Sequence, residues 1–280
     1  MRIYKTLVFL LCMAGLLLGM SGKALADNWM RSEGESYYKA GAEYDTAQNR
    51  WNQDNDSIKM SCTAKNWKLT QAYEYGMSYY QTFFGSIDYR DRSCGNNEAS
   101  GIGDLSLGIR RRLDIYRNGR TWEAAVIIPT GYSTKGTAQI GSGLYGLRLG
   151  AFGSFGDKTL TGGEYGSNVE LGANIYIWEG TASEELSGYI KYNFAATQES
   201  HFYAALEGDY ALIDRNKNLT TVAVNQVSDY GYDRLNVRFG YSRRATLYWR
   251  VAVEVTDVVW GRNTNDSRSV TINFSRNFLD

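Results

Sequence analysis

The chain has 280 residues, and its 30 lysine and arginine side chains are balanced by 30 aspartate and glutamate side chains. This neutral balance lacks the basic footprint of a nucleic-acid-binding protein, so no nucleic-acid partner is expected. The chain also holds 22 tyrosines, 7 tryptophans and 30 glycines, but only 1 proline. Because Tyr and Trp favour membrane–water interfaces and proline cannot donate to a strand ladder, the composition indicates paired strands at a membrane.

The first residues predict a cleaved secretory signal peptide over residues 1–26. Arg2 and Lys5 precede an apolar stretch that ends at Met20, and residues 24–26, Ala-Leu-Ala, form a small-x-small cleavage site. The apolar stretch is about 15 residues long, short of the roughly 20 that a spanning helix needs, although a retained N-terminal anchor is the alternative. We interpret residues 27–280 as one exported outer-membrane β-barrel domain.

Residues 27–280 alternate between apolar and polar positions in short pieces. In residues 102–115, the apolar positions Leu105, Leu107 and Ile109 are separated by single small or polar residues, whereas a helix would space them three and four apart. We therefore predict an all-β fold, a transmembrane antiparallel up-and-down β-barrel of about 12 strands, or about 14 if residues 218–228 also pair. A soluble β-sandwich is the alternative. The predicted strands are residues 35–46, 66–77, 79–90, 102–115, 119–130, 143–155, 165–178, 185–195, 201–213, 232–243, 246–258 and 268–278.

The predicted turns differ between the two ends of the barrel. With both termini in the periplasm, the short turns fall on the periplasmic side and the long loops outside, as in known barrels. Cys62 and Cys94 then lie in the first two external loops, and an isolated pair in an oxidising compartment most often forms a disulfide. We therefore predict a Cys62–Cys94 disulfide. The predicted external loops are residues 47–65, 91–101, 131–142 and 214–231.

The end of the chain indicates the partners. Residues 270–278 alternate up to a late aromatic residue, Phe278, and resemble the terminal signal that the outer-membrane assembly machinery recognises, although Leu279 and Asp280 follow. The expected location is the cell outer membrane. The expected partners are the assembly machinery, outer-membrane lipid and lipopolysaccharide, and a small-molecule solute.

The inward positions of the predicted strands give the lumen a mixed charge. A barrel of about 12 strands is narrow, so opposite charges can pair across its lumen. Two interpretations stay open: a salt-bridged interior that only stabilises the barrel, and a constricted pathway that selects small solutes. The candidate lumen-lining residues are Glu74, Asp104, Arg110, Arg112, Asp114, Glu123, Arg148, Glu170, Lys191, Glu207, Arg238, Arg250 and Glu254.

Catalytic, cofactor and metal sites are not expected, and the chain is not predicted to be an enzyme. His201 is the single histidine, and the cysteine–histidine spacing of metal sites is absent. Ser200 and His201 are adjacent, and neighbouring residues of a strand point to opposite faces, so they do not suit a nucleophile and its base.

Two short motifs resemble a known family. Residues 101–108, Gly-Ile-Gly-Asp-Leu-Ser-Leu-Gly, open a strand that ends in a basic stretch, and the next strand closes with residues 128–131, Ile-Pro-Thr-Gly. This order, together with residues 261–263 after a β-branched strand, resembles the outer-membrane barrel family named for the meta-pathway of phenol degradation. The resemblance implies transport of small molecules, with aromatic or hydrophobic compounds among them, and it implies no particular binding residue.

These observations together predict an outer-membrane channel or transporter for small solutes. The alternative is a non-conducting structural or interaction barrel, because the predicted charges of the lumen are balanced.

Overall fold

The computed structural model describes residues 30–113, 120–131, 140–141, 143–157, 167–179, 184–212 and 232–278. The predicted signal peptide, the candidate Asp114 and the extended stretch 218–228 lie outside these residues. Within the described residues, no helix is long and apolar enough to cross a membrane. The strands are β1 Ser36–Trp51, β2 Ser57–Ser78, β3 Gln81–Cys94, β4 Asn97–Ile102, β5 Leu105–Arg112, β6 Thr121–Ile128, β7 Gly146–Asp157, β8 Ser167–Trp178, β9 Glu185–Ala195, β10 Ser200–Ala211, β11 Asp233–Arg244, β12 Trp249–Arg262 and β13 Thr264–Phe278.

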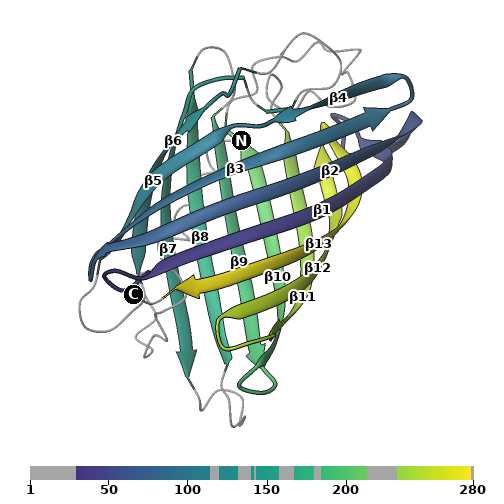
Figure 1. Cartoon of the computed structure of the whole chain (residues 1–280). Helices are drawn as coiled ribbons and strands as arrows, with labels where there is room; N and C mark the ends of the chain where they lie inside the picture. The colour runs from purple at the N-terminus through teal and green to yellow at the C-terminus, as the bar shows by residue number, and fades with distance from the viewer. Residues whose placement is uncertain are drawn as a thin grey trace.

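The strands form one closed antiparallel barrel (Figure 1). β1 pairs with both β2 and β13, so the first and last strands of the chain close the ring. β4 pairs with the second half of β3 and β5 pairs with its first half, so β4 and β5 are two pieces of one wall strand. The prediction of an all-β up-and-down barrel of 12 strands is confirmed, with β4 as an extra strand.

The break between β4 and β5 coincides with the glycine motif. The Gly103 amide donates to the Asp88 carbonyl at 2.7 Å, and a Cβ on Gly103 would lie only 1.9 Å from the Asp88 carboxylate. From the neighbouring chain segment, the Thr130 hydroxyl donates to the Ile102 carbonyl at 2.9 Å. The two motifs of the sequence therefore meet at one place in the barrel wall, where only glycine fits and a threonine satisfies a carbonyl at the strand break.

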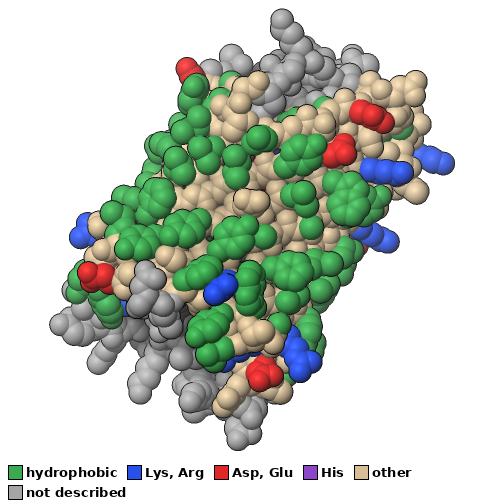
Figure 2. All heavy atoms as spheres, viewed as in Figure 1, with side chains coloured by type: hydrophobic (Ala, Val, Ile, Leu, Met, Phe, Trp, Pro, Cys, Tyr) green, Lys and Arg blue, Asp and Glu red, His purple; other side chains and the backbone are tan. Residues whose placement is uncertain are grey.

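The outer surface of the barrel is apolar. Phe239, Val255 and Val270 are partners in register on β11, β12 and β13, and their side chains are 60%, 49% and 48% exposed. Hydrophobic side chains cover the middle of the face in Figure 2, and charged side chains gather toward its two ends. This distribution matches a wall whose middle lies in hydrocarbon.

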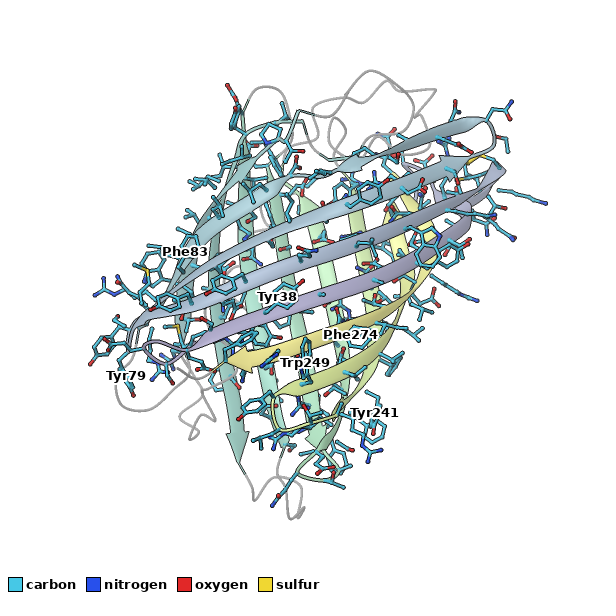
Figure 3. All side chains as sticks on the ribbon, viewed as in Figure 1. Tyr38, Tyr79, Phe83, Tyr241, Trp249 and Phe274 are labelled. Atoms are coloured by element: carbon cyan, nitrogen blue, oxygen red, sulfur yellow. A yellow bond between two sulfur atoms is a disulfide. The ribbon has the colours of Figure 1, made fainter. Side chains whose placement is uncertain are left out.

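Aromatic side chains encircle one end of the apolar zone. Figure 3 shows a band of them around the lower part of the barrel, near the turns β2–β3 and β11–β12. Tyr and Trp at this height place their rings in the membrane and their polar tips in the interfacial layer. The labelled members are Tyr38, Tyr79, Phe83, Tyr241, Trp249 and Phe274.

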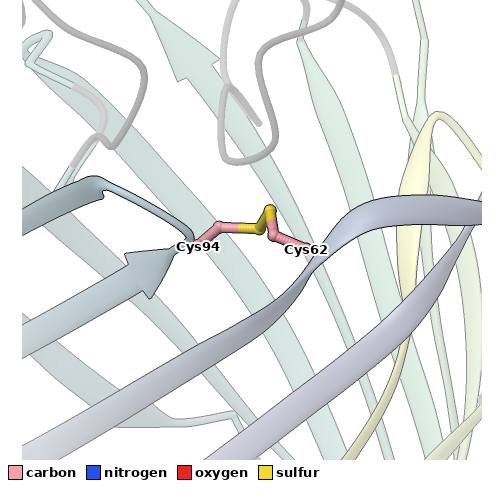
Figure 4. The surroundings of a disulfide bond; sticks show 2 residues. All are labelled: Cys62 and Cys94. Carbon is pink, nitrogen blue, oxygen red and sulfur yellow. A yellow bond between two sulfur atoms is a disulfide. The ribbon is translucent and has the colours of Figure 1, made fainter.

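The predicted disulfide is present, but its predicted position in long loops is wrong. Cys62 and Cys94 are bonded with a Cα–Cα distance of 5.4 Å, and they lie in β2 and at the end of β3 (Figure 4). The strands run past the predicted loop boundaries at 47–65 and 91–101, because residues 58–64 keep the alternating pattern after the Asn/Asp-rich turn at 52–56. The β1–β2 register shifts at this point, which leaves residues 60–63 of β2 unpaired with β1 and brings Cys62 to Cys94.

Candidate functional site

The lumen of the barrel contains a continuous network of five charged side chains. Glu74 accepts from Arg31 at 2.6 Å and lies 3.5 Å from Arg110. Glu123 lies 3.1 Å from both Arg110 and Arg148, and its side chain is only 4% exposed. β2, β5, β6 and β7 present four of these residues to the same inner face, because adjacent strands are in register and inward positions recur every second residue.

The fifth residue, Arg31, comes from a segment that folds back into the barrel. Gly34 has a φ of 79°, a left-handed conformation that suits glycine, and the chain before it turns over β2 and β3. The Arg31 amide donates to the buried Thr82 hydroxyl at 3.0 Å. A Cβ on Gly76 would lie 1.8 Å from the Ser32 carbonyl oxygen, so the segment rests directly on the inner wall.

A second group of ion pairs lines the wall from β8 to β12. Lys191 lies 3.3 Å from Glu170. Arg238 lies 2.8 Å from Glu207 and 3.4 Å from Glu254, on the two strands that flank it. Each of these carboxylates is therefore neutralised by a cation from an adjacent strand.

The ion pairs run along the wall. Sequence reasoning expected opposite charges to pair across a narrow lumen, but the strand residues described above pair with neighbouring strands, apart from Arg110–Glu74, which spans β3. Arg31–Glu74 is a separate case, because Arg31 comes from the segment before β1. The physical reason is the register. A charge and its opposite at directly paired inward positions, such as Arg110 and Glu123, are much closer to each other than to any residue on the far wall.

The inner aromatic rings lie flat against glycines of the wall. A Cβ on Gly108 would lie 2.5 Å from the Phe84 ring, and a Cβ on Gly240 would lie 2.1 Å from the Tyr203 ring. Gly172 likewise faces the Tyr189 ring at 2.3 Å. Because the missing Cβ atoms leave room for the rings, these side chains pack directly against the wall.

The remaining predicted lumen residues have less regular surroundings. Asp104 lies in the break between β4 and β5. The Arg112 guanidinium stacks over the Tyr79 ring at 4.8 Å. Arg250 donates to the Ser242 hydroxyl at 3.0 Å and lies 3.5 Å from His201.

Ser200 and His201 do not form a catalytic pair. The Ser200 hydroxyl lies 3.2 Å from the Tyr241 hydroxyl, on the outer face, whereas His201 contacts Arg250 in the lumen. The two side chains point to opposite faces of β10, as adjacent strand residues must. Across the described ranges, no cluster of three or more His, Cys, Asp and Glu side chains is arranged to hold a metal ion.

Sequence reasoning missed three contributors to the lumen. Arg31 precedes the first strand, so the period-2 pattern of that strand could not show whether Arg31 faces the lumen. Phe83 and Phe84 are adjacent aromatic residues, so the sequence does not show which of the two faces the lumen. The same ambiguity applies to the adjacent aromatic residues Phe202 and Tyr203. Each ring faces a glycine at the paired inward position of the next strand, Gly108 for Phe84 and Gly240 for Tyr203, but this pairing becomes visible only once the register is known.

A closed antiparallel barrel with an apolar outside and a charged inside is the fold of the outer-membrane β-barrel proteins. The structure is similar to the COG4313 outer membrane channel from Pseudomonas putida F1, with a TM-score of 0.72 and 13% sequence identity over 90% of this chain and 98% of that chain. It is less similar to the translocator domain of the autotransporter NalP from Neisseria meningitidis, with a TM-score of 0.50 and 13% identity over 90% and 91% of the two chains. No family model and no curated protein matches the sequence.

Proposed function

We propose that this protein is an outer-membrane channel for small solutes. The observation that carries the proposal is the arrangement of the lumen side chains. Its ion pairs run along the wall, and its rings Phe84, Tyr189 and Tyr203 pack against wall glycines, an arrangement that favours a pathway along the barrel axis. The likeness of the fold to a protein that is itself described as an outer membrane channel supports the same function.

The class of solute is a finer proposal. The candidate lumen-lining residues give the pathway a charged, hydrogen-bonding surface, which suits small polar solutes. The proposal that aromatic or hydrophobic compounds pass rests on the resemblance to the meta-pathway family, and membership of that family remains a prediction.

The proposal includes the surroundings of the barrel. The chain is exported, its signal peptide is removed after residue 26, and both termini remain in the periplasm. The assembly machinery recognises β13, whose inner end carries Phe278. Outer-membrane lipid contacts the apolar belt, and lipopolysaccharide contacts the outer rim.

Single-channel recording of residues 27–280 in a planar bilayer tests the function. We expect stable current steps, and we expect larger steps when residues 27–33 are deleted, because the segment that carries Arg31 occupies part of the lumen. A correctly folded barrel that stays silent in both forms would contradict the channel. That result would favour a non-conducting structural barrel, for which the network around Glu74 and Glu123 serves stability alone.

A further inference from the structure

The cations of the lumen differ in whether they form an ion pair with a carboxylate. Arg110, Arg148, Lys191 and Arg238 each lie within 3.5 Å of a carboxylate. In contrast, Lys39, Arg244 and Arg250 form no ion pair with a carboxylate of the described residues.

These three cations lie in one row of the wall. Arg244 on β11 pairs in register with Arg250 on β12, Arg250 pairs with Ser275 on β13, and Ser275 pairs with Lys39 on β1. Strands are spaced about 4.8 Å apart, so the backbones of Arg250 and Lys39 are roughly 10 Å apart with the Ser275 hydroxyl between them. The row is close to the end of the barrel where β1 begins and β13 ends, since Arg244 ends β11 and Arg250 is the second residue of β12.

The nearest carboxylate on these strands is already engaged. Glu254 lies four residues beyond Arg250 on the same face of β12, where it accepts from Asn273 at 2.7 Å and lies 3.4 Å from Arg238. On the other side of Lys39, Glu74 is held by Arg31 and Arg110. Glu254 also acts on Lys39, but it is shared with Arg238, so the positive charge of the row is only partly offset.

Hydroxyl groups accompany the cations. The Ser242 hydroxyl contacts the Arg250 guanidinium at 3.0 Å, and Ser275 stands between Arg250 and Lys39. The paired positions next to the row are small, Ala72 beside Lys39 and Ala252 beside Ser242. Tyr37 also stands beside the row, and its hydroxyl is hydrogen-bonded to Ser275. A guanidinium, an ammonium and hydroxyl groups at one level of the wall provide the donors that suit an oxyanion.

We propose that Lys39, Arg250 and Ser275 form an anion subsite in the lumen, with Arg244 at its rim, and that it binds solutes carrying a carboxylate or phosphate group. The subsite deepens the proposed channel function, because a mouth lined by one sign of charge concentrates anionic solutes at the end of the pathway. The expected solute is thus a small anion whose carboxylate or phosphate group contacts this row.

Isothermal titration calorimetry on the folded barrel in detergent tests the subsite without any need for current. Inorganic phosphate and benzoate are the two probes, and benzyl alcohol is the uncharged control. We expect saturable binding of at least one anion, no comparable binding of benzyl alcohol, and a dissociation constant raised roughly tenfold or more in the Lys39→Gln/Arg250→Gln variant. Phosphate binding without benzoate binding would identify phosphate-bearing solutes, and the reverse would identify organic acids.

The matched control removes the same charge elsewhere. Lys59→Gln/Lys65→Gln takes two exposed ammonium groups from the other end of β2 and should leave the dissociation constant unchanged. Lys39→Arg keeps the charge and should keep the binding, which distinguishes recognition from a folding defect. Equal anion binding by wild type and Lys39→Gln/Arg250→Gln, or equal binding of benzoate and benzyl alcohol, would overturn the subsite even if the barrel conducts. A silent barrel that still binds the anion through these residues would overturn the channel and leave the subsite standing.

Discussion

Replacing Glu123 with glutamine tests the charge network of the lumen. The Glu123 carboxylate is 4% exposed and lies 3.1 Å from the guanidinium groups of both Arg110 and Arg148. Removing one partner of a buried ion pair costs about 3–5 kcal/mol, because the remaining charge stays buried. Glutamine keeps one acceptor oxygen, so we expect the free energy of unfolding to fall by about 3 kcal/mol, the lower end of that range.

Urea unfolding of the barrel in lipid vesicles measures this loss, with heat-modifiable migration on gels as the check that the barrel has closed. Glu98→Gln is the control, since Glu98 is an exposed carboxylate on β4 and its loss should change the free energy by less than about 0.5 kcal/mol. The double variant Glu123→Gln/Arg148→Gln should be less destabilised than the sum of the two single variants by at least about 0.5 kcal/mol. An unfolding midpoint for Glu123→Gln equal to that of the wild type would refute the network.

Three further predictions address the membrane face, the disulfide and the N-terminal segment. Val255→Arg, in the middle of the apolar face, should lower the free energy of unfolding by about 2–4 kcal/mol, and a Val255→Leu control should not. Cys62→Ser should lower the free energy of unfolding by about 2–4 kcal/mol and make that free energy independent of reductant. Labelling of Cys62 by a thiol reagent in the unreduced wild type would contradict the bond. Gly76→Val should displace the segment above it and expose Arg31 to trypsin in the folded barrel, and an unchanged cleavage rate would show that the segment is not seated there.

The strands could be predicted from the sequence because a membrane barrel repeats one simple rule. Residues such as Leu105, Leu107 and Ile109 must face lipid, so a period of two is visible in every spanning stretch. The outer ends of the strands were harder to predict. Residues 52–56 carry the Asn and Asp residues of a turn, and β2 begins directly after them at Ser57. Residues 58–64 keep the alternation, but in so short a piece beside a turn it was not enough to distinguish a strand from a loop. The disulfide pair was therefore predicted correctly and its local structure was not.

The partners of the lumen charges could not be predicted in the same way. Alternation tells which residues share a face, but the register between strands decides which of them meet, and a single sequence does not contain the register. Arg110 could have paired with any inward carboxylate, and the structure places it opposite Glu123. The Gly103 motif is a related case, because its role at a break in the wall depends on Asp88 of another strand.

The register also explains why one part of the wall keeps free charge. A cation opposite a carboxylate pairs with it, as Arg238 does with Glu207. Lys39 and Arg250 instead flank Ser275, so no carboxylate stands at the position directly between them. The ion pairs stabilise the wall, whereas the cations without a carboxylate partner are available to attract anionic solutes. The Lys39→Gln/Arg250→Gln variant should therefore lose anion affinity while its barrel still closes, which heat-modifiable migration on gels would show.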